Sequence, residues 1–178
     1  MSFLKRLWKS DHGLAAIEFA FILPVMVIMF LGVVETSNYI TVARRVASLS
    51  STAADLVAQE ASISNAEMSD VFGAINAICD PVDPAQAKIT ISSVVADADG
   101  TTYRIAWSDA RNTAPRTANS VVDASVFPAG LIAAFQGAIM VEVQYGYDPM
   151  FASFLPRTDL TDSFYLKPRR SLTVTRIP

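Results

Sequence analysis

The sequence predicts an α+β protein in which a long N-terminal membrane helix continues into an outer domain with an antiparallel β-sheet. Three observations lead to this fold class. The chain's only membrane-length apolar run lies at residues 14–34, apolar residues continue at helical spacing to about residue 59, and the later sequence alternates apolar with polar residues. A chain of 178 residues has room for one membrane helix and one modest domain.

The apolar run at residues 14–34 is long enough to cross a bilayer, because 21 residues of α-helix span about 31 Å. No Ala-x-Ala pattern follows it, which argues against removal as a secretory signal peptide. Pro24 removes one backbone hydrogen bond and is expected to kink the helix. A cluster of cations before the run favours an N-terminus inside the cell, although Arg44 and Arg45 beyond it dilute this bias. The cluster consists of Lys5, Arg6 and Lys9.

A single carboxylate, Glu18, lies about five residues inside this apolar run. Insertion of a charge at mid-membrane costs about 2.5–3.5 kcal/mol, and the position of Glu18 near the interface makes its cost smaller. The helix N-terminus offsets about 0.3–1 kcal/mol of that cost. Two interpretations remain open: Glu18 reaches the interface and has no role, or it is a functional intramembrane charge.

The order of features here resembles the processing site of type IV prepilins: a basic head, Gly13, four residues, Glu18 and then an apolar helix. Residues 13–39 resemble the TadE-like family of tight-adherence (Flp) pilus assembly proteins. The resemblance implies that a prepilin peptidase cuts between Gly13 and Leu14. It also implies that Glu18, followed by Phe19, neutralises the new N-terminal amine of a neighbouring subunit.

The resemblance extends more weakly to the C-terminal part of the chain, which includes residues 164–171. It implies a basic cytoplasmic leader (1–13), a transmembrane helix (14–34), a helical stalk extension (35–60) and a pilin-like periplasmic α+β domain (61–178). The implied location is the bacterial inner membrane, and the implied partners are other pilins and pilus assembly proteins. A cluster of cations near the C-terminus either binds an acidic partner or is simply solvated. It consists of Lys167, Arg169 and Arg170.

The helical extension carries an apolar seam, which is expected to pack on the chain's own outer domain rather than form a coiled coil. The seam consists of Tyr39, Val42, Val46, Leu49, Ala53 and Leu56. Ser64 and Glu67 form a capping-box pattern that predicts a second helix, ending near Cys79. Its predicted buried stripe is Met68, Val71, Phe72, Ile75 and Ile78. Cys79 is the only cysteine and is expected to be a buried packing residue.

Two alternating segments, residues 89–95 and 103–107, predict a β-hairpin in which Val95 faces Tyr103 and Ile91 faces Trp107. The connection would be a three-residue loop, with Gly100 in the left-handed conformation. The aspartates before Gly100 look like the start of a calcium loop. The glutamate that such a loop needs does not follow, which favours a turn without a metal.

The rest of the outer domain is predicted from the same patterns. Residues 109–126 predict a surface loop and residues 127–135 a short helical turn. Residues 139–147 predict a long central strand, and Leu172 and Val174 mark a final strand. The loop between these strands contains Phe151, Phe154 and Leu155, which are expected to fold back on the core.

Composition and motifs narrow the function further. A net charge of −3 and a pI near 5.1 argue against a nucleic-acid binder. The sole histidine, His12, lies in the leader, so the outer domain cannot form a Ser-His or Cys-His pair. No phosphate-binding, zinc or other cofactor motif is present, and we expect no enzyme activity. Three hypotheses remain: a minor pilin, an unprocessed single-pass scaffold of the same machine, and an unrelated membrane-anchored binding module.

Overall fold

The computed structural model describes residues 11–123, 126–128, 130–151 and 156–178, with side chains from residue 15 onward. The chain divides into two compact units. We call Met1–Ile40 with Asp148–Pro156 the helical unit, and Thr41–Tyr147 with Arg157–Pro178 the sheet unit.

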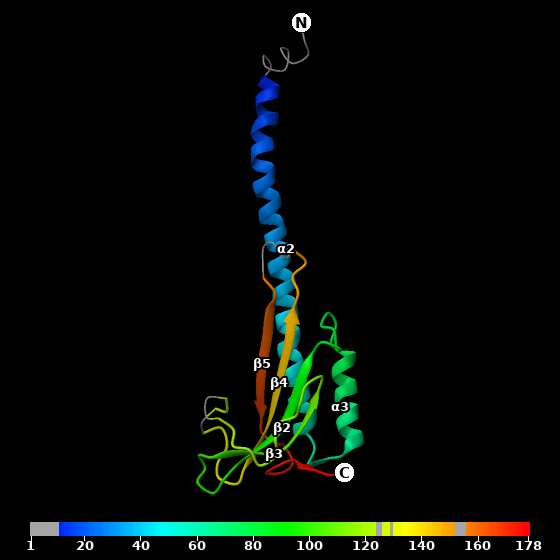
Figure 1. Ribbon diagram of the computed structural model, residues 1–178, viewed down its shortest axis with the longest axis vertical. Helices are drawn as coiled ribbons and strands as arrows, with labels where there is room; N and C mark the ends of the chain where they lie inside the picture. The colour runs from blue at the N-terminus through cyan, green and yellow to red at the C-terminus, as the bar shows by residue number, and fades with distance from the viewer. Residues whose placement is uncertain (1–10, 124–125, 129, 152–155) are drawn as a thin grey trace. The chain divides into compact units, whose positions relative to one another are not determined.

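Helix α2 runs without interruption from Asp11 to Ala58 and confirms the predicted long N-terminal helix (Figure 1). Pro24 lies inside it, and the helix continues on both sides of this residue. The helix ends one residue before the predicted end at 59. There the backbone N–H of Arg169 donates to the carbonyl of Ala58 at 2.8 Å, so one of the orphan carbonyls of the last turn is satisfied.

The sheet unit contains a four-stranded antiparallel sheet with the order β3-β2-β4-β5. Its strands are β2 (Lys88–Ala96), β3 (Tyr103–Arg111), β4 (Gly137–Tyr147) and β5 (Thr158–Leu166). The predicted long strand, β4, is central, as expected. A long helix followed by an antiparallel sheet confirms the α+β class.

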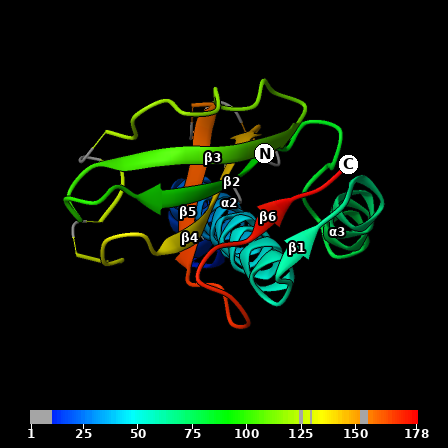
Figure 2. The same ribbon diagram turned by 90° about the horizontal axis from the view of Figure 1, so that it is seen from below.

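The part of α2 that belongs to the sheet unit lies against one face of the sheet (Figure 2). Its buried side chains include Val42, Val46, Leu49, Ala53 and Val57. Four of these belong to the predicted seam, so the seam packs on the chain's own sheet as expected. Tyr39 and Leu56, also predicted for it, are only half-buried. The hydroxyl of Ser50 donates to the carboxylate of Asp162 in β5, which adds a polar tie to this packing.

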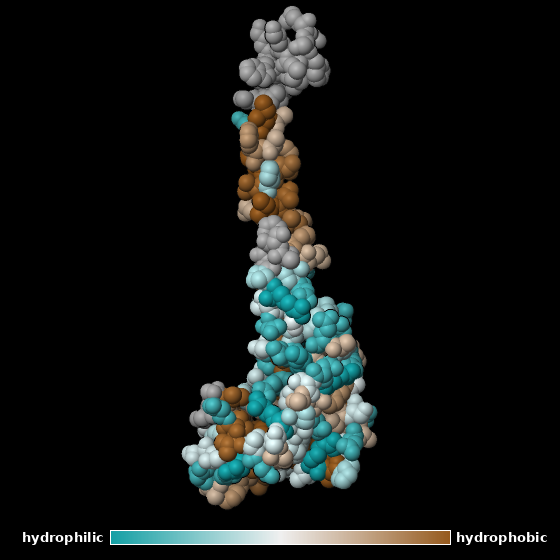
Figure 3. Space-filling view, in the orientation of Figure 1, coloured by the Kyte–Doolittle hydropathy of each residue, from teal (hydrophilic) through white to brown (hydrophobic). Residues whose placement is uncertain are grey.

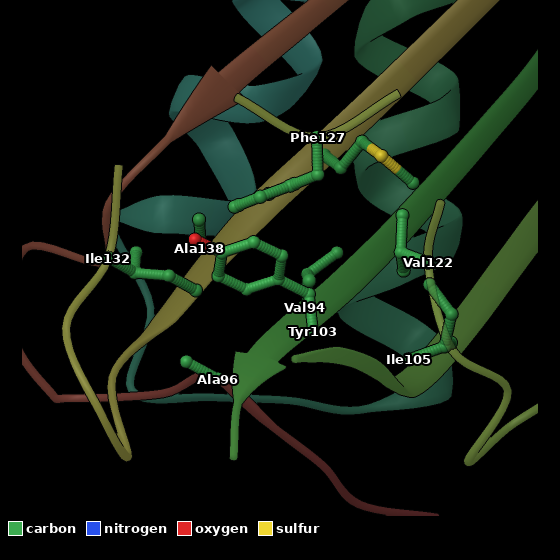
Figure 4. Packing of buried hydrophobic residues seen from close by; sticks show 9 residues of the cluster. Val94, Ala96, Tyr103, Ile105, Val122, Phe127, Ile132 and Ala138 are labelled. Atoms are coloured by element: carbon green, nitrogen blue, oxygen red, sulfur yellow. The ribbon is translucent and has the colours of Figure 1, made fainter. Parts of the chain in front are cut away.

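A second apolar cluster covers part of the opposite face of the sheet (Figure 4). Ala138 and Met140 of β4 belong to it, and successive strand residues point to opposite faces, so Ile139 and Val141 point toward α2. At its centre the ring of Phe127 lies 4.6 Å from that of Tyr103. The remaining members are Val94, Ala96, Ile105, Val122 and Ile132.

This cluster corrects the expectation that residues 109–126 form only a surface loop. Residues 109–111 continue β3, and Val122 is buried, with its N–H donating to the carbonyl of Tyr103 at 2.9 Å. The described residues of 127–135 form turns rather than the predicted helical turn. Phe127 nevertheless fills the centre of the cluster.

The predicted register of the β2–β3 hairpin is wrong. Tyr103 faces Ala96 rather than Val95, and Trp107 faces Ser93 rather than Ile91. One cause is a β-bulge, which shifts the pairing between Ser93 and Val94.

The other cause is the hairpin connection, which is longer than the predicted three residues. The N–H of Asp97 donates to the carbonyl of Thr102 at 2.8 Å, so the turn spans 97–102. Asp99 accepts hydrogen bonds from the hydroxyl and the backbone N–H of Thr102 and from the backbone N–H of Thr101, and these bonds lower the pKa of its carboxyl. Gly100 has φ +67°, which confirms its predicted left-handed conformation.

Helix α3 (Asn65–Ala77) begins with the predicted capping box. The N–H of Glu67 donates to the hydroxyl of Ser64, and the N–H of Ser64 donates to the carboxylate of Glu67 at 2.7 Å. The hydrogen bonds that the carboxylate of Glu67 accepts from the N–H and the hydroxyl of Ser64 lower the pKa of Glu67. Met68, Val71 and Ile75 are buried as predicted, and Cys79 just beyond the helix is also buried. Phe72 and Ile78, predicted for the same stripe, are half-buried.

Three strands differ from the prediction. Strand β5 was not predicted, and neither was the short β1 (Ser62–Ile63), which pairs in parallel with β6. The predicted final strand, β6, is limited to Thr175–Arg176, whereas Val174 is buried and Leu172 is 68 % exposed. Of the loop residues expected to fold onto the core, Phe154 and Leu155 lie outside the described residues, and Phe151 is half-buried.

Candidate functional site

The first half of α2 exposes a continuous apolar surface. The described side chains from residue 15 to residue 30 are all exposed, and the most apolar 18-residue window of the helix has a mean hydropathy of 2.6 (Figure 3). Such a surface is unfavourable in water, and its length and composition suit a bilayer. The helix therefore fits a membrane anchor. The prediction that the N-terminus lies inside the cell depends on three cations before the helix. They are Lys5, Arg6 and Lys9, and they lie outside the described residues.

Glu18 is exposed within this apolar surface, and the next residue, Phe19, is 58 % exposed. In lipid, a carboxylate in this position contacts hydrocarbon or headgroups unless another chain supplies a partner. The predicted processing bond between Gly13 and Leu14 lies in the first turn of α2, which begins at Asp11. Leu14 and Glu18 are four residues apart and therefore lie on the same side of the helix.

A second carboxylate, Glu35, closes the apolar segment at its other end. Between Glu18 and Glu35 no residue is charged, and the two are separated by about 26 Å along the helix axis. Unlike Glu18, Glu35 has no exposed surface. Its Oε2 accepts a hydrogen bond of 3.1 Å from the backbone N–H of Phe151.

Glu35 was not predicted as a site from the sequence, in which it directly follows the apolar run at residues 14–34. The sequence does contain a signal for it. A carboxylate beside a membrane-length apolar segment is a candidate functional charge for the same reason as Glu18. Its partner, Phe151, lies 116 positions away in the sequence, and nothing in the local pattern identifies that contact.

The C-terminal cations have different surroundings. Arg169 forms an ion pair with Asp55, and its backbone N–H caps α2, so this residue fastens the C-terminal segment to the helix. Lys167 and Arg170 are exposed, and their binding to an acidic partner stays a prediction.

The described residues contain no group of three or more His, Cys, Asp or Glu side chains placed to hold a metal ion. In the turn that looked like a calcium loop, Asp97 pairs with Arg104 at 2.8 Å. Asp99 accepts hydrogen bonds from the side chains and backbone of Thr101 and Thr102. Both carboxylates therefore stabilise the turn itself.

Comparison with known proteins finds no match among curated proteins and none among solved structures. One family model, described as TadE-like protein, matches residues 13–55. The match begins at Gly13, includes Glu18 and Glu35, and ends three residues before the end of α2. Over this segment, which is about a quarter of its length, the chain is similar to the TadE-like family.

Proposed function

We propose that the protein is a minor pilin or pseudopilin-type component in the assembly of a tight-adherence (Flp, type IV) pilus, held in the bacterial inner membrane by α2. The observation that carries this proposal is the coincidence of two features over the same residues. The TadE-like match at 13–55 falls on the helix whose first half is exposed, apolar and interrupted by Glu18. The sheet unit would lie in the periplasm.

Glu18 acts in this proposal as the assembly carboxylate. Cleavage after Gly13 leaves a free amine at Leu14, and a neighbouring subunit places its own Glu18 against that amine. At about 4 Å and an effective dielectric constant near 20, such a pair gains about 4 kcal/mol. An unpaired carboxylate in the bilayer instead costs up to about 2.5–3.5 kcal/mol. The charge therefore drives helices together laterally.

The position of the processing bond suits a peptidase. Glycine costs a helix about 1 kcal/mol relative to alanine, and the first turn of any helix lacks part of its hydrogen bonding. The backbone around Gly13 therefore opens at low cost, while the helix beyond it stays intact. Prepilin peptidase, other pilins and pilus assembly proteins are the partners that this proposal requires.

The test replaces Glu18 in the native host and counts surface pili. Glu18→Ala removes the charge and is expected to reduce piliation about tenfold or more at an unchanged protein level, because each contact loses a pairing worth several kcal/mol. Glu18→Gln keeps the shape and is expected to fail similarly. Met29→Ala is the matched control, since Met29 is 66 % exposed on the same helix and carries no charge.

Normal piliation of the Glu18→Ala strain would contradict the proposal. The mass of the membrane-extracted protein provides the second readout. Loss of residues 1–13 supports processing between Gly13 and Leu14. A protein that keeps them instead supports the alternative of an unprocessed single-pass scaffold in the same machine.

A further inference from the structure

We propose that the loop around Met150 docks on the lipid interface where α2 leaves the membrane, and that Glu35 positions it there. The lipid is that of the outer leaflet. The inference rests on the part of the proposed function in which α2 spans the inner membrane and the sheet unit lies in the periplasm.

The depth of the loop follows from its contact with the helix. The N–H of Phe151 donates to Glu35 at 3.1 Å, and Glu35 is the first charged residue after the uncharged stretch 19–34. Loop and helix belong to the same compact unit, and Figure 1 shows the loop beside α2. The backbone at Phe151 therefore lies at the level of the helix where the apolar segment ends.

The chemistry of the loop at this level suits lipid. Pro149, Met150 and Phe151 carry no charge, and Met150 is 72 % exposed. On the helix, Phe30 is 67 % and Val33 is 68 % exposed, within two turns of Glu35. The loop and this end of the helix therefore both expose apolar side chains. The bilayer that covers the helix would also cover Met150, at the boundary between headgroups and acyl chains.

In this arrangement Glu35 accepts the hydrogen bond of a backbone N–H at the edge of the membrane. Water is scarce at the edge of the hydrocarbon region, and a backbone N–H without an acceptor is costly there. The carboxylate supplies that acceptor to Phe151 and holds the adjoining Met150 at a fixed level. Glu35 is therefore a positioning residue for lipid contact, whereas Glu18 is available to another subunit.

The test uses the full chain, reconstituted at low density in phosphatidylcholine–phosphatidylglycerol vesicles. An environment-sensitive fluorophore is attached to Met150→Cys in a Cys79→Ala background, and lipids spin-labelled near the top of the acyl chain act as quenchers. Phe21→Cys, at a position 78 % exposed on the apolar helix, is the membrane control. Thr101→Cys, in the exposed hairpin turn, is the water control.

We expect quenching at Met150→Cys that exceeds quenching at Thr101→Cys by at least about twofold, because shallow quenchers reach groups at the headgroup–acyl boundary. Quenching at Phe21→Cys without quenching at Met150→Cys would overturn the docking of the loop on lipid. It would leave the proposal that α2 is a membrane anchor intact. Absence of quenching at both positions would overturn the anchor and the inference together.

Replacement of Glu35 tests the positioning role. Glu35→Ala removes the acceptor for Phe151 and is expected to reduce quenching at Met150→Cys to the level of the water control. Glu35→Gln keeps an oxygen acceptor and is expected to retain it. Far-UV circular dichroism establishes that both variants keep their helix and sheet content. Full quenching in a folded Glu35→Ala variant would overturn the role of Glu35.

Discussion

At the scale of single residues, one carbonyl ties the C-terminal segment to the sheet. The indole N–H of Trp107 donates to the carbonyl of Val174 at 2.7 Å, and the hydroxyl of Ser93 lies 3.5 Å from the same oxygen. All of these groups are buried, so water cannot replace either donor. The short indole bond is the stronger of the two, because 3.5 Å is at the limit of a hydrogen bond.

Trp107→Phe is expected to lower the free energy of unfolding by about 1–2 kcal/mol. The substitution keeps most of the apolar ring but leaves the carbonyl of Val174 with the distant Ser93 hydroxyl alone. Urea unfolding of the full chain in detergent, followed by far-UV circular dichroism, measures the change. Ser93→Ala is the control and should cost less. Equal costs for the two variants would contradict the ranking of these bonds.

The carboxylates Glu18 and Glu35 of α2 show how much can be predicted from the sequence at this scale. Glu18 could be predicted as a candidate because its cost follows from local context, namely a charge inside an apolar run. Glu35 has the same local signal, but its burial depends on Phe151, which the fold brings from 116 positions away. Contacts of that range follow from tertiary structure and not from periodicity.

At the scale of secondary-structure elements, an ion pair helps to hold the segment between β3 and β4 to the sheet. Arg116 donates from Nε and Nη2 to the two carboxylate oxygens of Glu142 on β4, at 2.8 and 2.7 Å. Its backbone N–H also donates to the hydroxyl of Ser108 on β3 at 3.1 Å. The hydrogen bonds that Arg116 donates to the carboxylate of Glu142 raise the pKa of Arg116.

Arg116→Lys is expected to destabilise the protein by about 0.5–1 kcal/mol and to loosen this segment. Lysine keeps the charge, but it cannot form two parallel hydrogen bonds with one carboxylate. Because both side chains are partly exposed, at 36 % and 27 %, the loss stays small. Limited proteolysis should cut the 112–120 segment faster in the variant. Arg170→Lys, at an exposed position outside this segment, serves as control. Identical cleavage of Arg116→Lys and wild type would contradict the prediction.

The elements that the sequence did not predict are those whose pattern depends on distant partners. Strand β5 presents only one strongly buried side chain, Leu160, because an edge strand is covered on one side and carries polar residues. The two-residue strands β1 and β6 are too short to show any alternation. By contrast, α2 and α3 were predicted nearly to their ends, since helix periodicity and the capping box are local.

At the scale of the whole molecule, the second part of α2 is both stalk and core. The sheet unit begins at Thr41, well before the end of the helix at Ala58. Val46, Leu49 and Val57 are at most 1 % exposed. At about 1.5–3 kcal/mol for each buried side chain, these three contribute about 5–9 kcal/mol. That amount is comparable with the total stability of a typical domain, about 5–15 kcal/mol.

A fragment of residues 41–178 is therefore expected to fold in water without the membrane helix, whereas a fragment of residues 61–178 is not. The shorter fragment lacks the helix that covers one face of the sheet, so Ile91 and Val141 would be exposed to water. Thermal unfolding followed by circular dichroism should show a cooperative transition for the longer fragment and none for the shorter.

Leu49→Ala in the longer fragment provides a graded control, because it removes one fully buried side chain and should cost about 2–5 kcal/mol. A cooperative transition of fragment 61–178 at the same midpoint would show that the helix is dispensable for the sheet. In that case α2 would be only a tether. If only the longer fragment folds, residues 41–58 of α2 are an integral part of the hydrophobic core of the sheet unit.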